Sequence, residues 1–295
     1  VDEWERFVRR KLDAGEKFVI TGSNASLLSK ELGTRLTGRH ITYTLFPFSY
    51  AEFLKFSGKK EGIESFEEYL ANGGFPEFLK YGKAEMLQGL FNDIITKDII
   101  VRHKLRDEKA VRNIAVFLLS NISREFSCNS LAKTFGIGSA NTVVSYVGYM
   151  EDTFLLFTLP IFSFSLKKQQ VNPRKVYAID TGFLAANSAS FSGDKGRILE
   201  NAVFLHLRRK FKDIFYFKGR RECDFIVKDK GKDEYAVQSC LKLDEDNMER
   251  EVEGLKEAMK ILDIGKGVIV TLGQEDNLDG IKVIPAWKWM LGKKM

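Results

Sequence analysis

The first part of the chain alternates between helical and strand-like spacing of its apolar residues. Val1–Leu12 places its apolar side chains on one face, which predicts an amphipathic helix. Lys17–Asn24 is a β-branched and aromatic run closed by Gly-Ser-Asn, which predicts a buried strand with a polar tip. Ser26–Leu36 has the pattern of a helix and Ile41–Leu45 that of a further strand. Because strands without partners cannot form a sheet, we expect this segment to be the edge of something larger.

Residues 47–120 have a predominantly helical pattern. Ser49 followed by Glu52 is the signature of a capping box, so a helix is predicted to begin here. Gly73–Pro76 interrupts the helical pattern, and residues 83–120 then predict two long helices.

The segment from 121 to 170 has the element order of a winged helix. Gly136–Gly138 is a tight turn between two predicted helices, and Pro160 divides two predicted strands. The expected elements are helices over Ser127–Phe135 and Ser139–Met150, followed by strands over Phe154–Leu159 and Ile161–Leu166. A helix–turn–helix followed by a two-stranded ribbon is the winged-helix pattern.

The segment from 171 to 295 alternates helices and strands behind a polar linker, Lys167–Arg174. The predicted strands are Val176–Ile179, Ile214–Lys218, Glu222–Lys228, Glu234–Leu241 and Gly267–Leu272, and the predicted helices are Arg197–Lys210 and Met248–Leu262. This order predicts a mixed sheet. The predicted fold class is therefore α/β and multidomain.

Composition narrows the classes of function. Hydrophobic residues make up 44% and charged residues 29% of the chain, as in ordinary soluble proteins. No apolar run reaches the roughly 20 residues of a membrane span, so we expect a cytoplasmic protein without membrane contact. Cys128, Cys223 and Cys240 form no CxxC pair and no cluster with histidine, so no metal site is expected. The net charge of +6 permits a nucleic-acid partner.

Several short motifs together resemble one family. Thr21–Leu28, Leu36–Arg39 and Pro47–Leu54 are similar to the region after the Walker B strand in archaeal and bacterial AAA-type ATPases with a C-terminal nuclease-like domain of unknown function. The other segments that carry this resemblance are Gly73–Pro76, Asp93–Asp98, Tyr177–Gly182, Glu200–Val203 and Asp224–Val227. The likeness covers nearly the whole chain. It implies the C-terminal part of an AAA-type P-loop core with its helical lid (1–120), a winged helix (121–170) and a restriction-endonuclease-like α/β domain (171–295).

The resemblance implies nucleotide sensing by residues near the N-terminus. Ser23 or Asn24 would lie near the γ-phosphate, and Arg39, or less favourably Arg35, would reach toward a nucleotide. Helix capping by Ser23 and Asn24, and a surface position for Arg39, are the alternatives. The chain contains no GxxxxGK(S/T) loop. We therefore expect ATP and Mg²⁺ to bind the full-length parent, and this chain alone, without the phosphate-binding half, to hold neither tightly and not to hydrolyse ATP.

The same resemblance implies a degenerate nuclease site. In such a fold, carboxylates from a helix and two strands hold Mg²⁺, and a lysine orients or activates water. Glu200 takes the helix position and Asp224 the middle strand, whereas Gln238 and Cys240 stand where an acid and the lysine are expected. Lys242 is the candidate replacement, but its displacement along the strand favours an inactive site. The alternatives are weak cleavage and purely structural ion pairs with Lys218, Arg220 or Arg221.

Basic and small polar residues define a candidate DNA surface. In the winged helix they are Lys133, Asn141, Thr142, Lys167 and Lys168, with Arg174 and Lys175 at the basic end of the wing, and near the nuclease-like site they are Arg208, Arg209, Arg220 and Arg221. The second helix of the winged helix carries no Lys or Arg, which favours docking of a protein instead.

The sequence thus predicts the C-terminal portion of an ATP-binding AAA-type ATPase that couples nucleotide state to a DNA-binding effector module with an inactive nuclease-like site. A protein-interaction module without DNA contact and a Mg²⁺-dependent DNA nuclease are the alternatives. The sequence does not predict an oligomeric state.

Overall fold

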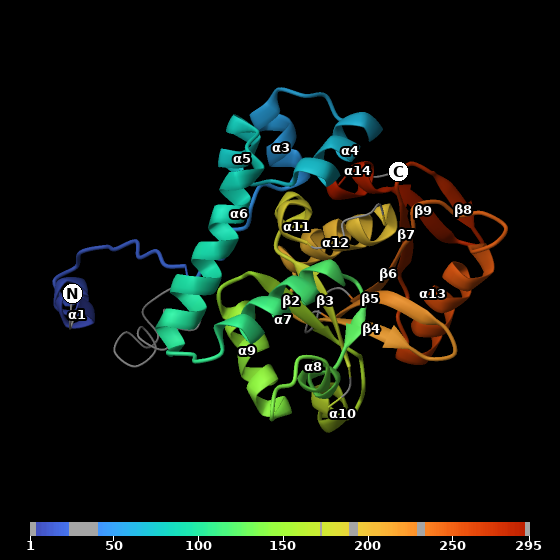
Figure 1. Ribbon diagram of the computed structural model, residues 1–295. Helices are drawn as coiled ribbons and strands as arrows, with labels where there is room; N and C mark the ends of the chain where they lie inside the picture. Colours follow the sequence, from blue (N-terminus) through green and yellow to red (C-terminus); the bar gives the residue numbers. More distant parts are fainter. Residues whose placement is uncertain (1–3, 24–40, 172, 189–193, 229–233, 293–295) are drawn as a thin grey trace.

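The protein combines helices with a three-stranded and a six-stranded sheet, so the predicted mixed α/β architecture is confirmed. The computed structural model describes residues 4–23, 41–171, 173–188, 194–228 and 234–292 (Figure 1). None of the helices within these ranges is both long enough and apolar enough to cross a bilayer.

The part before residue 121 is helical. Its elements are α1 (Trp4–Asp13), α3 (Tyr50–Ser57), α4 (Ile63–Asn72), α5 (Pro76–Tyr81), α6 (Ala84–Asp93), the π-helical η1 (Ile94–Val101) and α7 (Glu108–Ser120). The predicted capping box begins α3: the Ser49 N–H donates to Glu52 Oε2 over 2.7 Å, and Ser49 Oγ accepts from the Glu52 N–H. α6 continues directly into η1, so this helix and α7 are the two long helices predicted over 83–120.

The two strands predicted before residue 46 are wrong. Residues 17–23 and 41–45 are irregular, and Val19, Tyr43 and Leu45 are 94%, 86% and 98% exposed. A strand needs a hydrogen-bonded neighbour, and within the described ranges neither segment has one. Their hydrophobic pattern is that of β-strands, but over the described part of the chain neither segment is hydrogen-bonded to a neighbouring strand. The predicted helix Ser26–Leu36 lies outside the described residues.

A small sheet follows the helical part. Its elements are β1 (Glu125–Phe126), α8 (Cys128–Thr134), α9 (Ala140–Asp152), β2 (Leu156–Pro160), α10 (Leu166–Val171) and β3 (Arg174–Ala178). β3 lies between β1 and β2 and runs antiparallel to both. The strand predicted over Ile161–Leu166 is wrong, because Ser163 and Ser165 turn the chain and Ser165 Oγ accepts from the Lys168 N–H at the start of α10. The return strand is β3, which we had expected in the last domain.

The larger sheet is mixed. Its segment contains α11 (Thr181–Asn187), α12 (Lys195–Arg208), β4 (Ile214–Lys218), β5 (Glu222–Lys228), β6 (Glu234–Ser239), α13 (Met248–Leu262), β7 (Gly267–Thr271), β8 (Asp276–Leu278), β9 (Ile281–Pro285) and α14 (Ala286–Met290). The strand order is β4-β5-β6-β7-β9-β8, with β6, β7 and β9 parallel. Alternation along β5 sends Phe225 and Val227 to the core shared with α12, and Ile226 to the core beneath α13.

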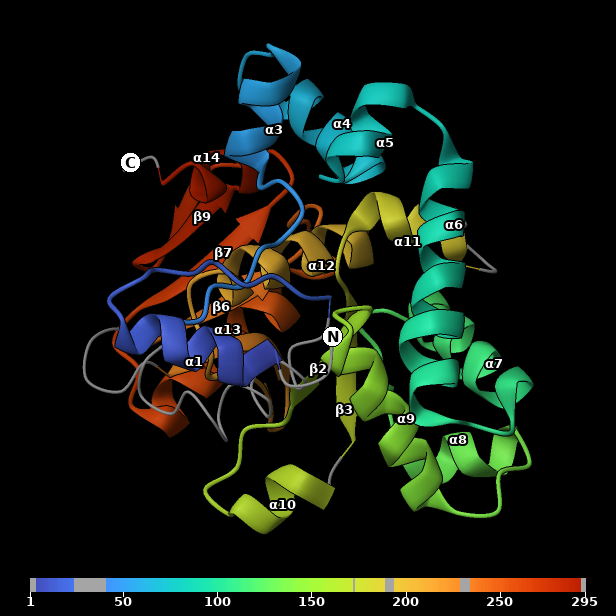
Figure 2. The ribbon, with the colours of Figure 1, turned by 90° about the vertical axis from the view of Figure 1, so that its left-hand side faces the viewer.

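The two sheets share a continuous hydrophobic core. Phe204 of α12 lies against Phe157 of β2 and Tyr177 of β3, with ring centroids 5.7 and 4.2 Å apart. Beyond β2, Ile161 forms a parallel bridge to Tyr216 of β4, and the Phe162 N–H donates to the Tyr216 carbonyl. Helices α3, α4 and α5 stand at one end of the molecule and α10 at the other (Figures 1 and 2).

A buried aspartate joins α11 to the helical part. Asp180 Oδ1 accepts from the Phe183 N–H at the start of α11, and Oδ2 accepts from the Gly74 N–H over 2.6 Å. Burial raises the pKa of Asp180 to about 6, although both backbone donors lower it. The backbones approach so closely that a Cβ on Gly182 would lie 2.0 Å from the carbonyl oxygen of Asn72.

We expect Gly182→Ala to lower the free energy of unfolding by about 2–3 kcal/mol, because the two backbones would have to separate. Gly89→Ala is the matched control. Gly89 lies within α6 with nothing within 4 Å of an added Cβ, so alanine should raise stability by about 0.5–1 kcal/mol. Denaturant unfolding of both variants measures the difference, and similar effects would contradict the close packing at α11.

Candidate functional site

The residues predicted for the nuclease-like site come together in space. Glu200 lies on α12, Asp224 on β5 and Gln238 on β6. The Asp224 N–H donates to Gln238 Oε1 over 3.2 Å, and Asp224 Oδ2 accepts from the Ser239 N–H over 3.0 Å. The side chains of Glu200, Asp224 and Gln238 all line one cleft of about 450 Å³. Three of the four residues predicted from the resemblance thus lie together at one end of the large sheet.

A lysine that we had assigned to the basic end of the wing is the centre of this cluster. Lys175 is 3% exposed, and its Nζ lies 3.1 Å from Glu200 Oε1, 3.1 Å from Asp224 Oδ1 and 2.7 Å from Glu222 Oε1. It reaches the acids from β3, a strand of the other sheet. Two residues on, and so on the same face of β3, the Tyr177 hydroxyl donates to Glu200 Oε1 over 2.8 Å. The placement of Lys175 on the exposed basic wing was therefore wrong.

Lys175 stays charged in this buried cluster, whereas the pKa of Glu200 lies near neutral pH. Burial alone would lower the pKa of Lys175, but Glu200, Tyr177 and the acids of β5 outweigh burial, and the pKa lies well above its ordinary value. Burial, followed by repulsion from Asp224, raises the pKa of Glu200 to about 7, while Lys175 lowers it. The cluster therefore depends on Lys175 for its charge balance.

The remaining positions of the predicted site have no catalytic arrangement. The Gln238 side-chain amide donates to Glu251 Oε2, and Glu251 pairs with Arg250 over 2.6 Å. Burial raises the pKa of the Cys240 thiol to about 12, so this thiol is neutral at physiological pH. Lys242 is exposed and does not line the cleft; its carbonyl accepts from the Asn247 side chain. The lysine of the cluster comes from β3 instead.

Cations surround the mouth of the cleft. The basic rim consists of Lys218, Arg220, Arg221 and Arg250. Arg220 and Arg221 are exposed, and their backbone N–H groups donate to the Glu257 carboxylate over 3.0 and 2.9 Å. Lys218 pairs with Glu125 of β1 over 2.8 Å. The structural alternative of Glu200 and Asp224 paired with these cations is wrong, because Lys175 occupies that role.

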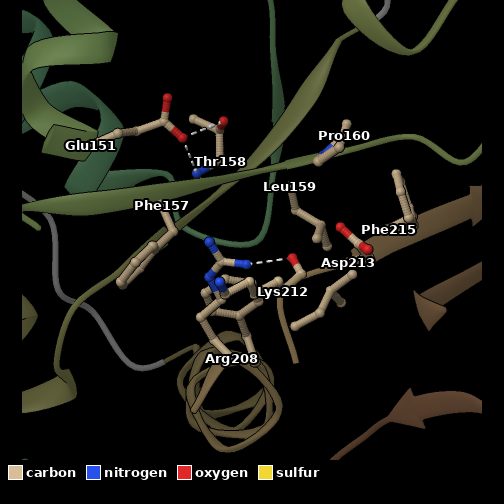
Figure 3. A pocket seen from close by; sticks show the side chains of 11 residues that line it. Glu151, Phe157, Thr158, Leu159, Pro160, Arg208, Lys212, Asp213 and Phe215 are labelled. Carbon is tan, nitrogen blue, oxygen red and sulfur yellow. Dashed lines mark hydrogen bonds between the residues drawn. The ribbon is translucent and has the colours of Figure 1, made fainter. Parts of the chain in front are cut away.

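Arg208 and Arg209, predicted to contact DNA, lie at the other end of α12. The Arg208 guanidinium projects from α12 into a second pocket of about 190 Å³, lies over the Phe157 ring and donates to the Lys212 carbonyl (Figure 3). Arg209 donates to the Pro47 carbonyl and lies 5.1 Å from the Phe46 ring centroid. Both are half-buried as well as engaged within the protein, so they offer less to a DNA backbone than the exposed Arg220 and Arg221 do.

The other predicted site residues are spread over the surface. Lys133 on α8, Asn141 on α9, and Lys167 and Lys168 on α10 are exposed, whereas Thr142 is half-buried. Ser23 is exposed, and its hydroxyl donates to Asp98 Oδ1 over 3.4 Å. Asn24 and Arg39 lie outside the described residues.

No three His, Cys, Asp or Glu side chains within the described ranges are grouped so that they could hold a metal ion. The carboxylates nearest to one another share the Lys175 ammonium, which provides the positive charge at their centre.

Replacing Lys175 tests this charge balance. Because the pKa of Glu200 is about 7 when folded and ordinarily 4.5, the folded state binds more protons in that window and stability falls as pH rises through it. Without Lys175, which lowers it, the pKa of Glu200 would rise further. Lys175→Met should therefore lower the free energy of unfolding by about 3–5 kcal/mol at pH 8, and by clearly less at pH 5.

Lys242→Met is the matched control, because this exposed lysine lies outside the cleft, and its effect should stay within about 0.5 kcal/mol at either pH. Denaturant unfolding at the two pH values provides the measurement. An equal loss for Lys175→Met at pH 5 and pH 8 would show that the ammonium does not neutralise the acids.

Comparison with known proteins divides the chain into three regions. Residues 1–54 match an AAA domain, residues 63–193 match a domain of unknown function (DUF8612), and residues 195–289 match another domain of unknown function (DUF4143). No solved structure matches the chain.

Two relatives align with almost the whole chain. An uncharacterized protein of Haemophilus influenzae is 27% identical, over 99% of this chain and 75% of that protein. The uncharacterized protein MJ1544 of Methanocaldococcus jannaschii is 34% identical, over 99% of this chain and 72% of that protein. The chain therefore belongs to the same protein family as MJ1544, with an AAA-domain segment followed by two domains of unknown function.

Proposed function

We propose that this chain is the C-terminal part of an AAA-type ATPase that couples nucleotide state to a DNA-binding effector module. The effector consists of a winged helix, formed by α7 to β3, and a nuclease-like cleft that binds DNA without cutting it. The observation that carries this proposal is the Lys175 ammonium within 3.1 Å of Glu200, Glu222 and Asp224.

The absence of cleavage follows from the occupancy of the acidic cluster. Metal-dependent nucleases need carboxylates that are free to bind Mg²⁺. Here an ammonium contacts the three acids, and Gln238 supplies a neutral amide that is already bonded to Glu251. A divalent cation would have to displace a buried Lys175, whose positive charge would then repel it.

DNA binding is supported by the contrast between the floor and the mouth of the cleft. The three acids around Lys175 share one ammonium, which compensates part of their negative charge. The basic rim faces solvent, where arginine forks suit phosphate oxygens. The element order α7-β1-α8-α9-β2-α10-β3 adds support, because a helical pair followed by two antiparallel strands is a common DNA-binding arrangement.

The link between the AAA segment and the effector runs through Phe46–Phe48. Arg209, just after α12, bonds to the Pro47 carbonyl. The Phe48 carbonyl accepts from the Tyr69 hydroxyl over 3.0 Å, and the Phe48 N–H donates to the Gly74 carbonyl over 2.7 Å. α12 also carries Glu200, so a shift of the AAA segment would act on the helix that supports the cleft.

Docking of a protein is the second candidate function, and one observation favours it. α9, the helix that would enter a DNA groove, has no Lys or Arg, and its Val144 is 54% exposed. A helix without basic side chains suits a protein surface better than phosphates. In that case the basic rim would be an ordinary solvated surface.

Fluorescence anisotropy with duplex DNA across a salt series separates these functions. We expect binding with a steep negative salt dependence. Arg220→Gln/Arg221→Gln should weaken binding and make the slope of log K against log salt shallower by about 2, because two phosphate contacts are lost. Lys55→Gln/Lys80→Gln, which removes two exposed cations from α3 and α5, outside the lining of the cleft, is the matched control and should change neither.

Incubation of the wild type with Mg²⁺ or Mn²⁺ and linear or supercoiled DNA should give no cleavage. Cutting that Asp224→Ala abolishes would replace the binding proposal with a true nuclease. Failure to bind any DNA at low salt would favour the protein-docking function.

A further inference from the structure

A small apolar surface with two lysines stands beyond the three-stranded sheet. We call Phe164–Lys168 the wing tip. Phe164 is 83% and Leu166 74% exposed, and Lys167 and Lys168 are exposed beside them. Single exposed apolar residues are common, but an exposed aromatic and an exposed leucine two positions apart on one projecting tip are not explained by core packing.

The wing tip has a supported conformation. Ser165 caps α10, and the Gln169 side chain donates back to the Ser163 carbonyl over 2.7 Å. The Phe164 ring makes an edge contact with Phe162, at 5.3 Å between centroids. Phe162 in turn packs edge-on against Phe215 of β4, at 5.6 Å. Phe164 is therefore presented from a base fixed to the large sheet, and its insertion into a partner would cost little ordering entropy.

Charge indicates the class of partner. No acidic residue occurs between Asp152 and Asp180, a stretch that contains Lys167, Lys168, Arg174 and Lys175. The first two of these are exposed at the tip itself. An apolar wedge flanked by cations complements a polyanion that can admit a side chain between stacked rings. The minor groove of duplex DNA has this property, and Phe and Leu are among the residues that open its base steps.

The wing tip lies where a duplex bound along the basic rim of the cleft could reach it. Ile161 forms an isolated parallel bridge to Tyr216 of β4, and β4 ends at Lys218, a member of the basic rim. α10 stands at the end of the molecule away from α5 in both views (Figures 1 and 2). A duplex lying along the basic rim would thus meet the wing tip on its path beyond β4.

We propose that the wing tip inserts Phe164 and Leu166 into the minor groove and partly unstacks a base step, while Lys167 and Lys168 bind the neighbouring phosphates. This inference rests on the proposed DNA binding and adds a local distortion of the duplex. No covalent step is involved.

The test uses a duplex of about 20 base pairs with 2-aminopurine at each TA step, because these steps unstack most easily. Wild-type protein should raise the 2-aminopurine fluorescence at saturation. Phe164→Ala/Leu166→Ala should abolish the rise and weaken binding about tenfold, since the stacking contact is lost. Both residues are exposed, so the variant should keep the wild-type thermal midpoint.

Two further variants separate the effect of the apolar wedge from the effect of charge and from the effect of removing any exposed aromatic residue. Lys167→Gln/Lys168→Gln should weaken binding and lower its salt dependence but retain the fluorescence rise at saturation. Tyr81→Ala removes an exposed aromatic (55% exposed) at the opposite end of the molecule and should change neither property.

The outcomes are distinguishable. Binding by the wild type without a fluorescence rise, or with the same rise for Phe164→Ala/Leu166→Ala, overturns the wedge and leaves DNA binding intact. Absence of any DNA binding overturns both proposals, and a lowered affinity of Phe164→Ala/Leu166→Ala for a protein partner would then identify the tip as a protein contact.

Discussion

The contact of one buried ammonium with three carboxylates determines how the two sheets of this protein meet. Lys175 belongs to the small sheet, whereas its partners Glu200, Glu222 and Asp224 belong to the large sheet and its helix. Neither the ammonium nor the carboxylates could be buried without the other, because an isolated buried charge of either sign is strongly unfavourable. The electrostatic contact therefore fixes the orientation of β3 against α12 and β5, and the aromatic core around Tyr177 and Phe204 packs within that arrangement.

Much of the architecture was accessible from periodicity and turn chemistry. Local rules predicted the capping box at Ser49, the long helices over 83–120 and strands β4 to β7 of the large sheet, whereas β8 and β9 were missed. The first strands failed because pairing depends on partners that the pattern cannot supply. The predicted strand over Ile161–Leu166 failed because two serine side chains favour a turn and a cap over pairing.

The sequence predicted Glu200 and Asp224 of the candidate site but not its lysine. The resemblance located Glu200, Asp224 and Gln238 correctly relative to one another, since helix and strand order fixes their positions in a mixed sheet. It did not locate Lys175, because the family pattern places its lysine at the end of β6, whereas Lys175 lies on β3 of the small sheet. One signal was present in the sequence: Lys175 precedes Val176, Tyr177 and Ala178, a run that reads as a buried strand. A lysine at the start of a buried strand is itself buried and needs acidic partners. Net charge alone does not reveal this requirement.

The central position of β3 also limits how this chain can evolve. The strand completes one sheet and, through a single side chain, completes the charge balance of the other. Recombination at the boundary suggested by composition, near residue 170, would separate the small sheet from its middle strand and would combine acids and lysine from unrelated parents. A chain that exchanged only one of the two regions would therefore need to acquire Lys175 and its acids together to keep this charge balance.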